Sequence, residues 1–324
     1  MFDYKYEKLL DRYEDWEALM KPIPNLKTQR LAEAVDAFDF NHRRITGFAL
    51  TPVEVAFHAR RDQVFSDYAT FKTTGKIDGG LARLNAPYKE SSEKYNEEFF
   101  KQANEFESIR NSKESAGLTH RWGLQYINLL LENVYGMQRA LESLFSSVVI
   151  ESWTAFEALA SDLWVIGVDD GPAEVVARLT VASPKSFKQP EDNIRPEKVH
   201  ELGIDARKNY GLFLRETGKV TFQRLRDIQL YYNLAFGEAA GKKFDEIANG
   251  YIFALSAFRN ALTHNQGKAD KYFIKQIQRF AEFRSIKPND ELALDGELVR
   301  KLRDSSVELG IALIKLVNEL LPSA

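Results

Sequence analysis

The chain contains no cysteine among its 324 residues. This absence excludes disulfide frameworks, cysteine-ligated zinc, iron–sulfur clusters and catalysis by a thiol. Histidine is also scarce, with five residues in all. Four of them, His42, His58, His120 and His200, are scattered without the spacing that metal ligands show. We therefore expect no metal site and no cofactor, and we interpret these four as surface or internally satisfied side chains.

Long apolar runs are missing as well. No stretch of about 18 apolar residues occurs, so no transmembrane helix is expected. The first eight residues, MFDYKYEK, are charged throughout and lack the apolar segment of a signal peptide. A formal net charge of −3 argues against a protein that coats nucleic acid broadly, so any contact with RNA has to be a local patch. We expect a cytoplasmic protein without a membrane partner.

Alternating, strand-like patterns are scarce, and no glycine-rich phosphate loop follows a predicted strand. Apolar residues at helical spacing dominate instead, which predicts an all-α fold. Thr51, Pro52 and Glu54 are typical of a helix start, as N-cap, first helical residue and capping-box acid. Helices are predicted over residues 28–44, 51–71, 88–115, 124–168, 245–264, 268–283 and 297–321.

The stretch from 124 to 168 is apolar on nearly all sides, which is typical of a central helix. The pattern weakens between about 172 and 241, and we interpret that segment as an insertion. Glycines at 75, 79 and 80 predict a flexible connection, and residues 287–290 predict a turn. We expect an N-terminal helical region over 1–115, of unknown role, and a helical bundle over 120–324.

The most informative stretch is Arg259-Asn260-Ala261-Leu262-Thr263-His264, which Gly267 is expected to terminate. Arginine offers a permanently charged fork that suits phosphate, and histidine is the side chain that titrates near neutral pH. Together they are sufficient for metal-free cleavage of a phosphodiester. The alternative is structural: a histidine at a helix C-terminus is favoured by the helix dipole, and Arg259 would then simply pair with a buried acid.

On a helical wheel, Arg259 and His264 stand at the two borders of one polar strip. They converge on one ligand only if it lies over the strip or if a second copy faces it. Asn260 lies one turn before His264, where its amide is placed to hydrogen-bond the imidazole. Ile252 and Phe253 place apolar surface on the same strip, which predicts that a partner covers it.

Other charged residues are candidates for supporting roles. Glu157 borders the apolar face of the central helix, where an unpaired carboxylate is costly, and Arg259 is its natural partner; the alternative is a surface glutamate. The basic residues after the motif are candidates for contacts with an RNA backbone, beside stacking surfaces on Tyr272 and Phe273, although charge runs are usually only solvated faces. These basic residues are Lys268, Lys271, Lys275 and Arg279.

The motif resembles the signature of the HEPN superfamily, all-α bundles that carry R-x(4–6)-H at the end of a long helix. Residues 151–159 resemble the central helix that packs on the motif helix, and 292–295 resemble the closing segment. The resemblance covers roughly 120–324, interrupted at 172–241.

The resemblance implies a metal-independent endoribonuclease, often a toxin or antiviral defence effector, with an active site shared across a homodimer. His264 would act as general acid or base on the ribose 2′-hydroxyl, and Arg259 would stabilise the charge that develops on phosphorus. An antitoxin or regulatory protein is an implied partner. The alternative function is a non-catalytic helical scaffold that binds a nucleotide or protein.

Overall fold

The computed structural model describes residues 23, 25–75, 88–110, 113–181, 208–247 and 250–322. These residues form eleven α-helices and one 3-10 helix and no β-strand, which confirms the all-α prediction. None of the described helices is both long and apolar enough to cross a membrane. The helices are α3 (Gln29–Thr74), α5 (Tyr88–Arg110), α6 (Lys113–Asn133), α7 (Met137–Asp169), α8 (Ala173–Val181), α10 (Tyr210–Glu216), α11 (Leu225–Phe236), α12 (Glu238–Ile247), α13 (Ile252–His264), α14 (Lys271–Ile277), η3 (Ala281–Phe283) and α15 (Gly296–Leu320).

Contacts between Cα atoms divide the chain into two compact units. Unit 1 holds the described residues up to Thr46 and those from Glu142 onward, and unit 2 holds Gly47–Leu141. This division falls at other residues than the boundary near 115–120 expected from the sequence. Both boundaries between the units lie inside helices, in α3 and in α7.

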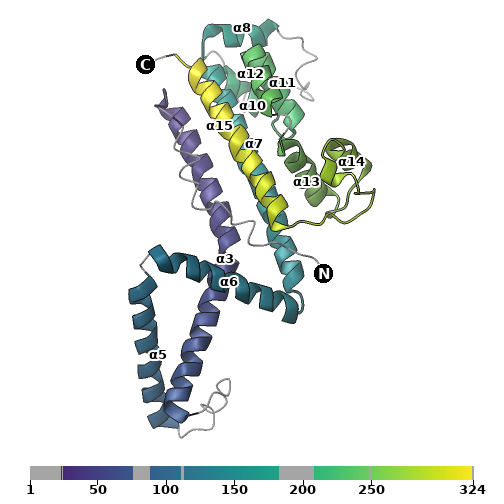
Figure 1. Cartoon of the computed structure of the whole chain (residues 1–324). Helices are drawn as coiled ribbons and strands as arrows, with labels where there is room; N and C mark the ends of the chain where they lie inside the picture. The colour runs from purple at the N-terminus through teal and green to yellow at the C-terminus, as the bar shows by residue number, and fades with distance from the viewer. Residues whose placement is uncertain are drawn as a thin grey trace. The chain divides into compact units, whose positions relative to one another are not determined.

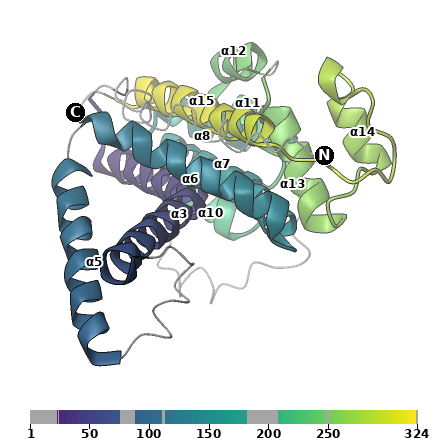
Figure 2. The ribbon, with the colours of Figure 1, turned by 60° about the horizontal axis from the view of Figure 1, so that its bottom comes forward.

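The core of unit 1 is built around α7, α15 and the first part of α3, which lie side by side (Figures 1 and 2). Trp153, Phe156 and Trp164 of α7 are fully buried. Gly310 lets α15 approach closely, because a Cβ there would lie 2.7 Å from the Phe38 ring of α3. Helix α13 packs against α14 and α15, and places Arg259 beside α7.

The described part of the segment interpreted as an insertion contributes to this core. Trp164 of α7 donates its indole N–H to the carbonyl of Tyr231 at 2.9 Å, and Tyr232 donates its hydroxyl to the carbonyl of Ala160 at 2.8 Å. Both tyrosines are buried. Helix α11 is therefore attached to the centre of unit 1 by side chains as well as by apolar packing.

Unit 2 contains the second part of α3 together with α5 and α6. Tyr95 of α5 donates a hydrogen bond to Ser66 of α3 at 2.9 Å, and the Phe57 and Phe106 rings lie 5.8 Å apart. The predicted helix start at Thr51 is wrong, since α3 continues through Pro52. The Thr51 hydroxyl donates to the carbonyl of Gly47, four residues earlier, instead of capping a new helix.

Other predicted helix boundaries also differ from the structure. The helix expected from 88 to 115 ends at Arg110, and the apolar stretch from 124 to 168 is broken between Asn133 and Met137. Gly136, with a φ of 86°, makes this break possible. The motif helix begins at Ile252 rather than at 245, because α12 occupies the preceding residues.

Two helix ends and a turn follow the sequence closely. Helix α7 ends at Asp169 as expected, and α15 runs over Gly296–Leu320 against a prediction of 297–321. Asp295 caps α15 by accepting a hydrogen bond from the Leu298 amide at 2.8 Å. The predicted turn at 287–290 is present, closed by a hydrogen bond from the Asp290 amide to the Lys287 carbonyl. Gly79 and Gly80 lie outside the described residues.

Candidate functional site

The motif helix α13 ends in a sharp change of backbone direction. The amides of Asn265 and Gly267 both donate to the carbonyl of Ala261, at 2.9 and 3.1 Å. Gln266 and Gly267 take left-handed conformations, with φ of 54° and 73°. This confirms that Gly267 takes the chain out of the helix, because a glycine adopts this conformation without a steric penalty.

Arg259 is the most firmly held polar residue of the motif. Its side chain is 19% exposed, and Nη2 lies 3.9 Å from Oε2 of Glu157 on α7. That glutamate oxygen also accepts a hydrogen bond of 2.9 Å from the indole of the fully buried Trp153. The predicted pairing of Glu157 with Arg259 is confirmed, and Trp153 is a partner that sequence reasoning missed. Its spacing of four residues from Glu157 was the available signal.

Asn260 is oriented by the arginine and not by the histidine. Nη1 of Arg259 donates to the carboxamide oxygen of Asn260 at 3.1 Å. The hydrogen bond expected between Asn260 and His264 is therefore wrong. Two neighbouring residues can meet because the long guanidinium reaches sideways over the adjacent side chain.

The guanidinium has donors left over. Nε of Arg259 is buried and has no hydrogen-bonding partner among the described residues. An arginine carries five N–H donors, and the Nη2 contact with Glu157 is longer than a hydrogen bond. Arg259 is therefore positioned by its surroundings with donors of its terminal nitrogens unused, while its Nε is enclosed by the chain.

His264 has a contrasting environment. Its side chain is exposed, and no group among the described residues forms a hydrogen bond or ion pair with its imidazole. Five residues of helix separate it from Arg259 by about 140° of rotation and about 7.5 Å of rise. One copy of α13 thus directs the two side chains in different directions.

The polar strip of α13 is buried near the start of the helix and accessible near its end. Ile252 is 1% exposed and Ser256 is 7% exposed, so the chain itself covers this part. Phe253 is half-buried, with the Arg279 guanidinium 3.8 Å from its ring centroid. The expectation that these apolar residues need a partner to cover them is therefore wrong. Asn260, Thr263 and His264 form the accessible end of the strip.

The four basic residues expected to contact RNA form a ladder that lies only partly on α14. Lys271 and Lys275 are exposed and one turn apart on α14, but Lys268 precedes the helix and Arg279 follows its end. The Asp270 side chain caps the start of α14 by accepting from the Phe273 amide at 2.6 Å, so the helix begins at Lys271 and Lys268 lies outside it. Arg279 contacts the Phe253 ring, and the three lysines are exposed.

The two aromatic side chains beside this ladder differ. Phe273 is buried and packs edge-on against Phe258, with ring centroids 5.1 Å apart, so it offers no stacking surface. Tyr272 is 58% exposed and lies between Lys271 and Lys275 on the outside of α14. One exposed ring between two lysines is what remains of the predicted patch.

The histidines outside the motif have separate environments. His42 is fully buried in α3, and His58 is partly exposed, with Nε2 at 3.9 Å from Glu54. His120 and His200 lie outside the residues whose side chains are described. No group of three or more potential ligands occurs in the described part of the chain.

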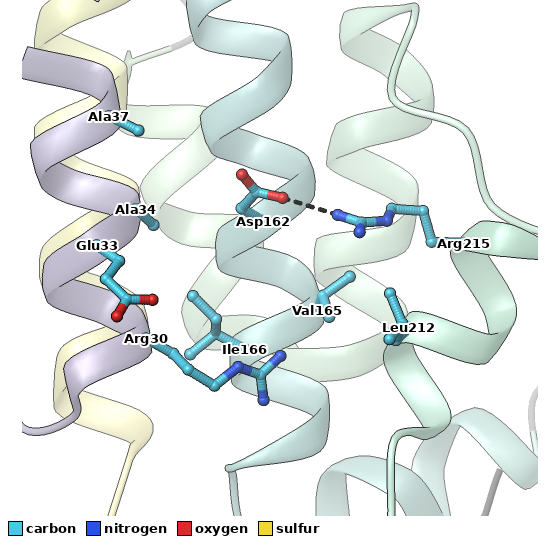
Figure 3. Close-up of a pocket in the computed structure, with 9 residues that line it drawn as sticks. All are labelled: Arg30, Glu33, Ala34, Ala37, Asp162, Val165, Ile166, Leu212 and Arg215. Carbon is cyan, nitrogen blue, oxygen red and sulfur yellow. Dashed lines mark hydrogen bonds and ion pairs between the residues drawn. The ribbon is translucent and has the colours of Figure 1, made fainter. Parts of the chain in front are cut away.

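A cavity of about 250 Å³ lies between α3, α7 and α10, away from the motif residues (Figure 3). Its charged side chains compensate one another: Arg215 pairs with Asp162 at 2.7 Å, and Arg30 pairs with Asp170 at the same distance. Glu33 faces the cavity from α3. Both arginines that line the cavity are thus already paired, and Glu33 accepts a hydrogen bond of 2.9 Å from Gln29, so the lining residues offer no free cation that would bind an anion.

The motif residues are thus brought together in part: Glu157, Arg259 and Asn260 form one connected group, and His264 stands apart from it. Three lysines and Tyr272 lie on the elements that follow. Comparison with known proteins finds no matching family model, no similar curated protein and no similar solved structure.

Proposed function

We propose that this protein is a metal-independent endoribonuclease of the HEPN type that acts as a toxin or antiviral effector. The observation that supports this best is the state of Arg259. It is held beside α7 by Glu157 and Asn260, yet its side chain is 19% exposed and its Nη2 contact with Glu157 is too long for a hydrogen bond. A guanidinium fixed in this way is suited to receive a phosphate oxygen, because little entropy is lost when the ligand binds.

The proposed reaction is transesterification within the RNA strand. The His264 imidazole removes the proton of a ribose 2′-hydroxyl, and the 2′-oxygen attacks the adjacent phosphorus. The bond from phosphorus to the 5′-oxygen breaks, and that oxygen takes a proton from a general acid. The products are a 2′,3′-cyclic phosphate and a 5′-hydroxyl, and Arg259 stabilises the extra negative charge on the phosphoryl oxygens.

A homodimer accounts for the separation of the two groups. Because Arg259 and His264 are about 140° apart on α13, one copy does not direct both at one phosphate. In an isologous contact between two α13 ends, Arg259 of one copy faces the same cleft as His264 of the other. This argument replaces the one from exposed apolar residues, which the chain itself covers.

The RNA strand would run along α14. Lys268, Lys271 and Lys275 are exposed and supply positive charge for the phosphates, and Tyr272 supplies a ring for base stacking. Replacing Tyr272 by alanine is expected to weaken binding of single-stranded RNA by about 1–3 kcal/mol.

The first experiment is cleavage of single-stranded RNA in the presence of EDTA. Arg259→Ala and His264→Ala should each slow cleavage by roughly 100-fold or more, with His58→Ala as the matched control that keeps full activity. The product end should be a 2′,3′-cyclic phosphate. RNA that stays intact at high protein concentration would favour the non-catalytic scaffold. Cleavage retained in both motif variants would place the active site elsewhere.

The second experiment tests the shared site by mixing the two inactive variants. Heterodimers of Arg259→Ala with His264→Ala contain one cleft in which both groups are native. Random exchange of subunits should therefore restore about a quarter of wild-type activity. An active wild type with no recovery on mixing would refute the shared site and leave a site within one copy.

A further inference from the structure

A second hollow of unit 1 lies at the C-terminal end of the motif helix. It has a volume of about 460 Å³ and is bounded by α7, by the end of α13 and by the residues that lead into α15. Leu262 and Gln266, two residues on either side of His264, contribute to its wall. We call it the α13-end groove.

The floor of the α13-end groove is apolar. Leu262, Leu292 and Leu298 are only partly covered by the chain, and Ile150 of α7 is half-buried beside them. Leu294 completes the floor and is 6% exposed. A backbone hydrogen bond joins two walls of the groove: the Leu292 amide donates to the carbonyl of Gly267 at 2.9 Å. The hollow is thus built into the fold.

The charged side chains around this floor are all carboxylates. Three carboxylates line the groove, from Glu142, Glu291 and Asp295, and no lysine, arginine or histidine is among the lining residues. The negative dipole end of α13 and the positive dipole end of α15 both lie at the groove, and Asp295 accepts the Leu298 amide as N-cap of α15, so the exposed Glu291 is the carboxylate that the proposal uses. Lys268 is paired with Glu291 only through an isolated backbone bridge, and no ion pair joins their side chains.

We propose that the α13-end groove binds a segment of a partner protein that presents a lysine or arginine flanked by bulky apolar side chains. The apolar floor supplies the burial that drives association, and the carboxylates select a cation and repel an anion. An RNA strand carries a negative charge at each phosphate and would be repelled here. The strand proposed for the active site would therefore lie on the α14 side, and the groove is left to a different partner.

The groove lies where a bound partner would contact the end of the motif helix. Its wall includes residues on both sides of His264, so an occupant lies against the end of the helix that carries the proposed general base. The binding proposal stands without the cleavage reaction, because it depends on the groove alone. A test that measures binding therefore fails or succeeds independently of RNase activity.

The experiment uses the full chain and a library of short random peptides displayed on phage. Peptides are selected on the wild type and depleted on Glu291→Lys, an exposed position where a change of charge leaves the fold intact. We expect enrichment of sequences with a basic residue next to leucine, isoleucine or phenylalanine. A synthetic enriched peptide is then titrated by fluorescence anisotropy against the wild type and four variants: Glu291→Lys, Glu291→Gln, Leu298→Ala and, as the distant control, Glu319→Gln.

The proposal expects roughly tenfold weaker binding to Glu291→Lys, smaller losses for Glu291→Gln and Leu298→Ala, and none for Glu319→Gln, with weakening by salt. Circular dichroism of each variant verifies the fold. Enrichment of acidic or purely apolar peptides, or no enrichment at all, would overturn the proposal. So would protection of the groove by RNA, or a change of oligomeric state in Leu298→Ala, which would assign the groove to RNA or to a second copy.

Discussion

His42 gives unit 1 a dependence on pH that can be worked out from the structure. It is 0% exposed and packs edge-on to the Phe38 ring, with centroids 4.5 Å apart. Burial, together with the positive charge of Arg303, lowers the pKa of His42 to about 3, while Asp39 opposes this shift. The imidazole is therefore neutral in the folded protein at any pH at which the protein is normally handled.

The sign of the effect follows from the two pKa values. In the unfolded chain His42 takes up a proton near its ordinary pKa of about 6.5, whereas in the folded chain it does so near a pKa of about 3. Its contribution to stability is complete above the unfolded value and is lost progressively as the pH falls towards the folded value. Between pH 7 and pH 5 the free energy of unfolding should fall by about 2 kcal/mol from this residue alone.

The assay is urea unfolding, followed by helical circular dichroism at pH 7 and at pH 5. His42→Leu removes the titrating group from the core, so this variant should lose about 2 kcal/mol less than the wild type between the two values. His58→Leu, which replaces a partly exposed histidine, is the matched control and should behave as the wild type does. An equal loss in the wild type and in His42→Leu would refute the reasoning.

Six further substitutions at four positions test the packing and the buried contacts by thermal and urea unfolding. Gly310→Ala should destabilise the protein by about 1–2 kcal/mol, because its Cβ would meet Phe38, whereas Gly47→Ala in an open part of α3 should stabilise it by up to about 1 kcal/mol; equal effects would contradict the close approach. Glu157→Gln should keep the fold and impair cleavage. Glu157→Ala should lower the free energy of unfolding by about 1–3 kcal/mol more than Glu157→Gln does, because the Trp153 indole loses its acceptor. An unchanged melting temperature in both variants would show that Glu157 is a simple surface residue. Burial raises the pKa of Asp169, so its contribution to stability falls as the pH rises, and Asp169→Asn should be at least as stable as wild type at neutral pH. Asp169→Ala should lose about 1–3 kcal/mol, because the Gly211 amide loses its acceptor, and a stable alanine variant would contradict that role.

Helix ends that depend on a single local residue could be predicted from the sequence. The end of α13 follows from Gly267, and the start of α15 follows from Asp295 just before a helical apolar pattern. Where two causes compete, sequence reasoning failed. Pro52 after Thr51 is a strong start signal, but packing inside unit 2 holds α3 together across it at the expense of one backbone hydrogen bond.

The candidate site shows the same limit. Spacing alone placed Glu157 near Arg259, because both border apolar faces that must pack together. Spacing could not show that Asn260 forms its hydrogen bond with Arg259 and not with His264, because that choice depends on how far the Arg259 side chain extends. The cover over Ile252 and Phe253 also depends on residues distant in sequence, including Arg279, and no periodicity within α13 reveals it.

The indole of Trp153 gives the proposed site an optical reporter of its own. Its N–H is bonded to the same glutamate oxygen that faces Arg259, so a ligand that draws the guanidinium away changes the electrostatic field at the ring. The chain has four tryptophans. The emission that the wild type has and Trp153→Phe lacks would therefore record occupancy of Arg259 in real time, without a label and in variants that no longer cleave RNA.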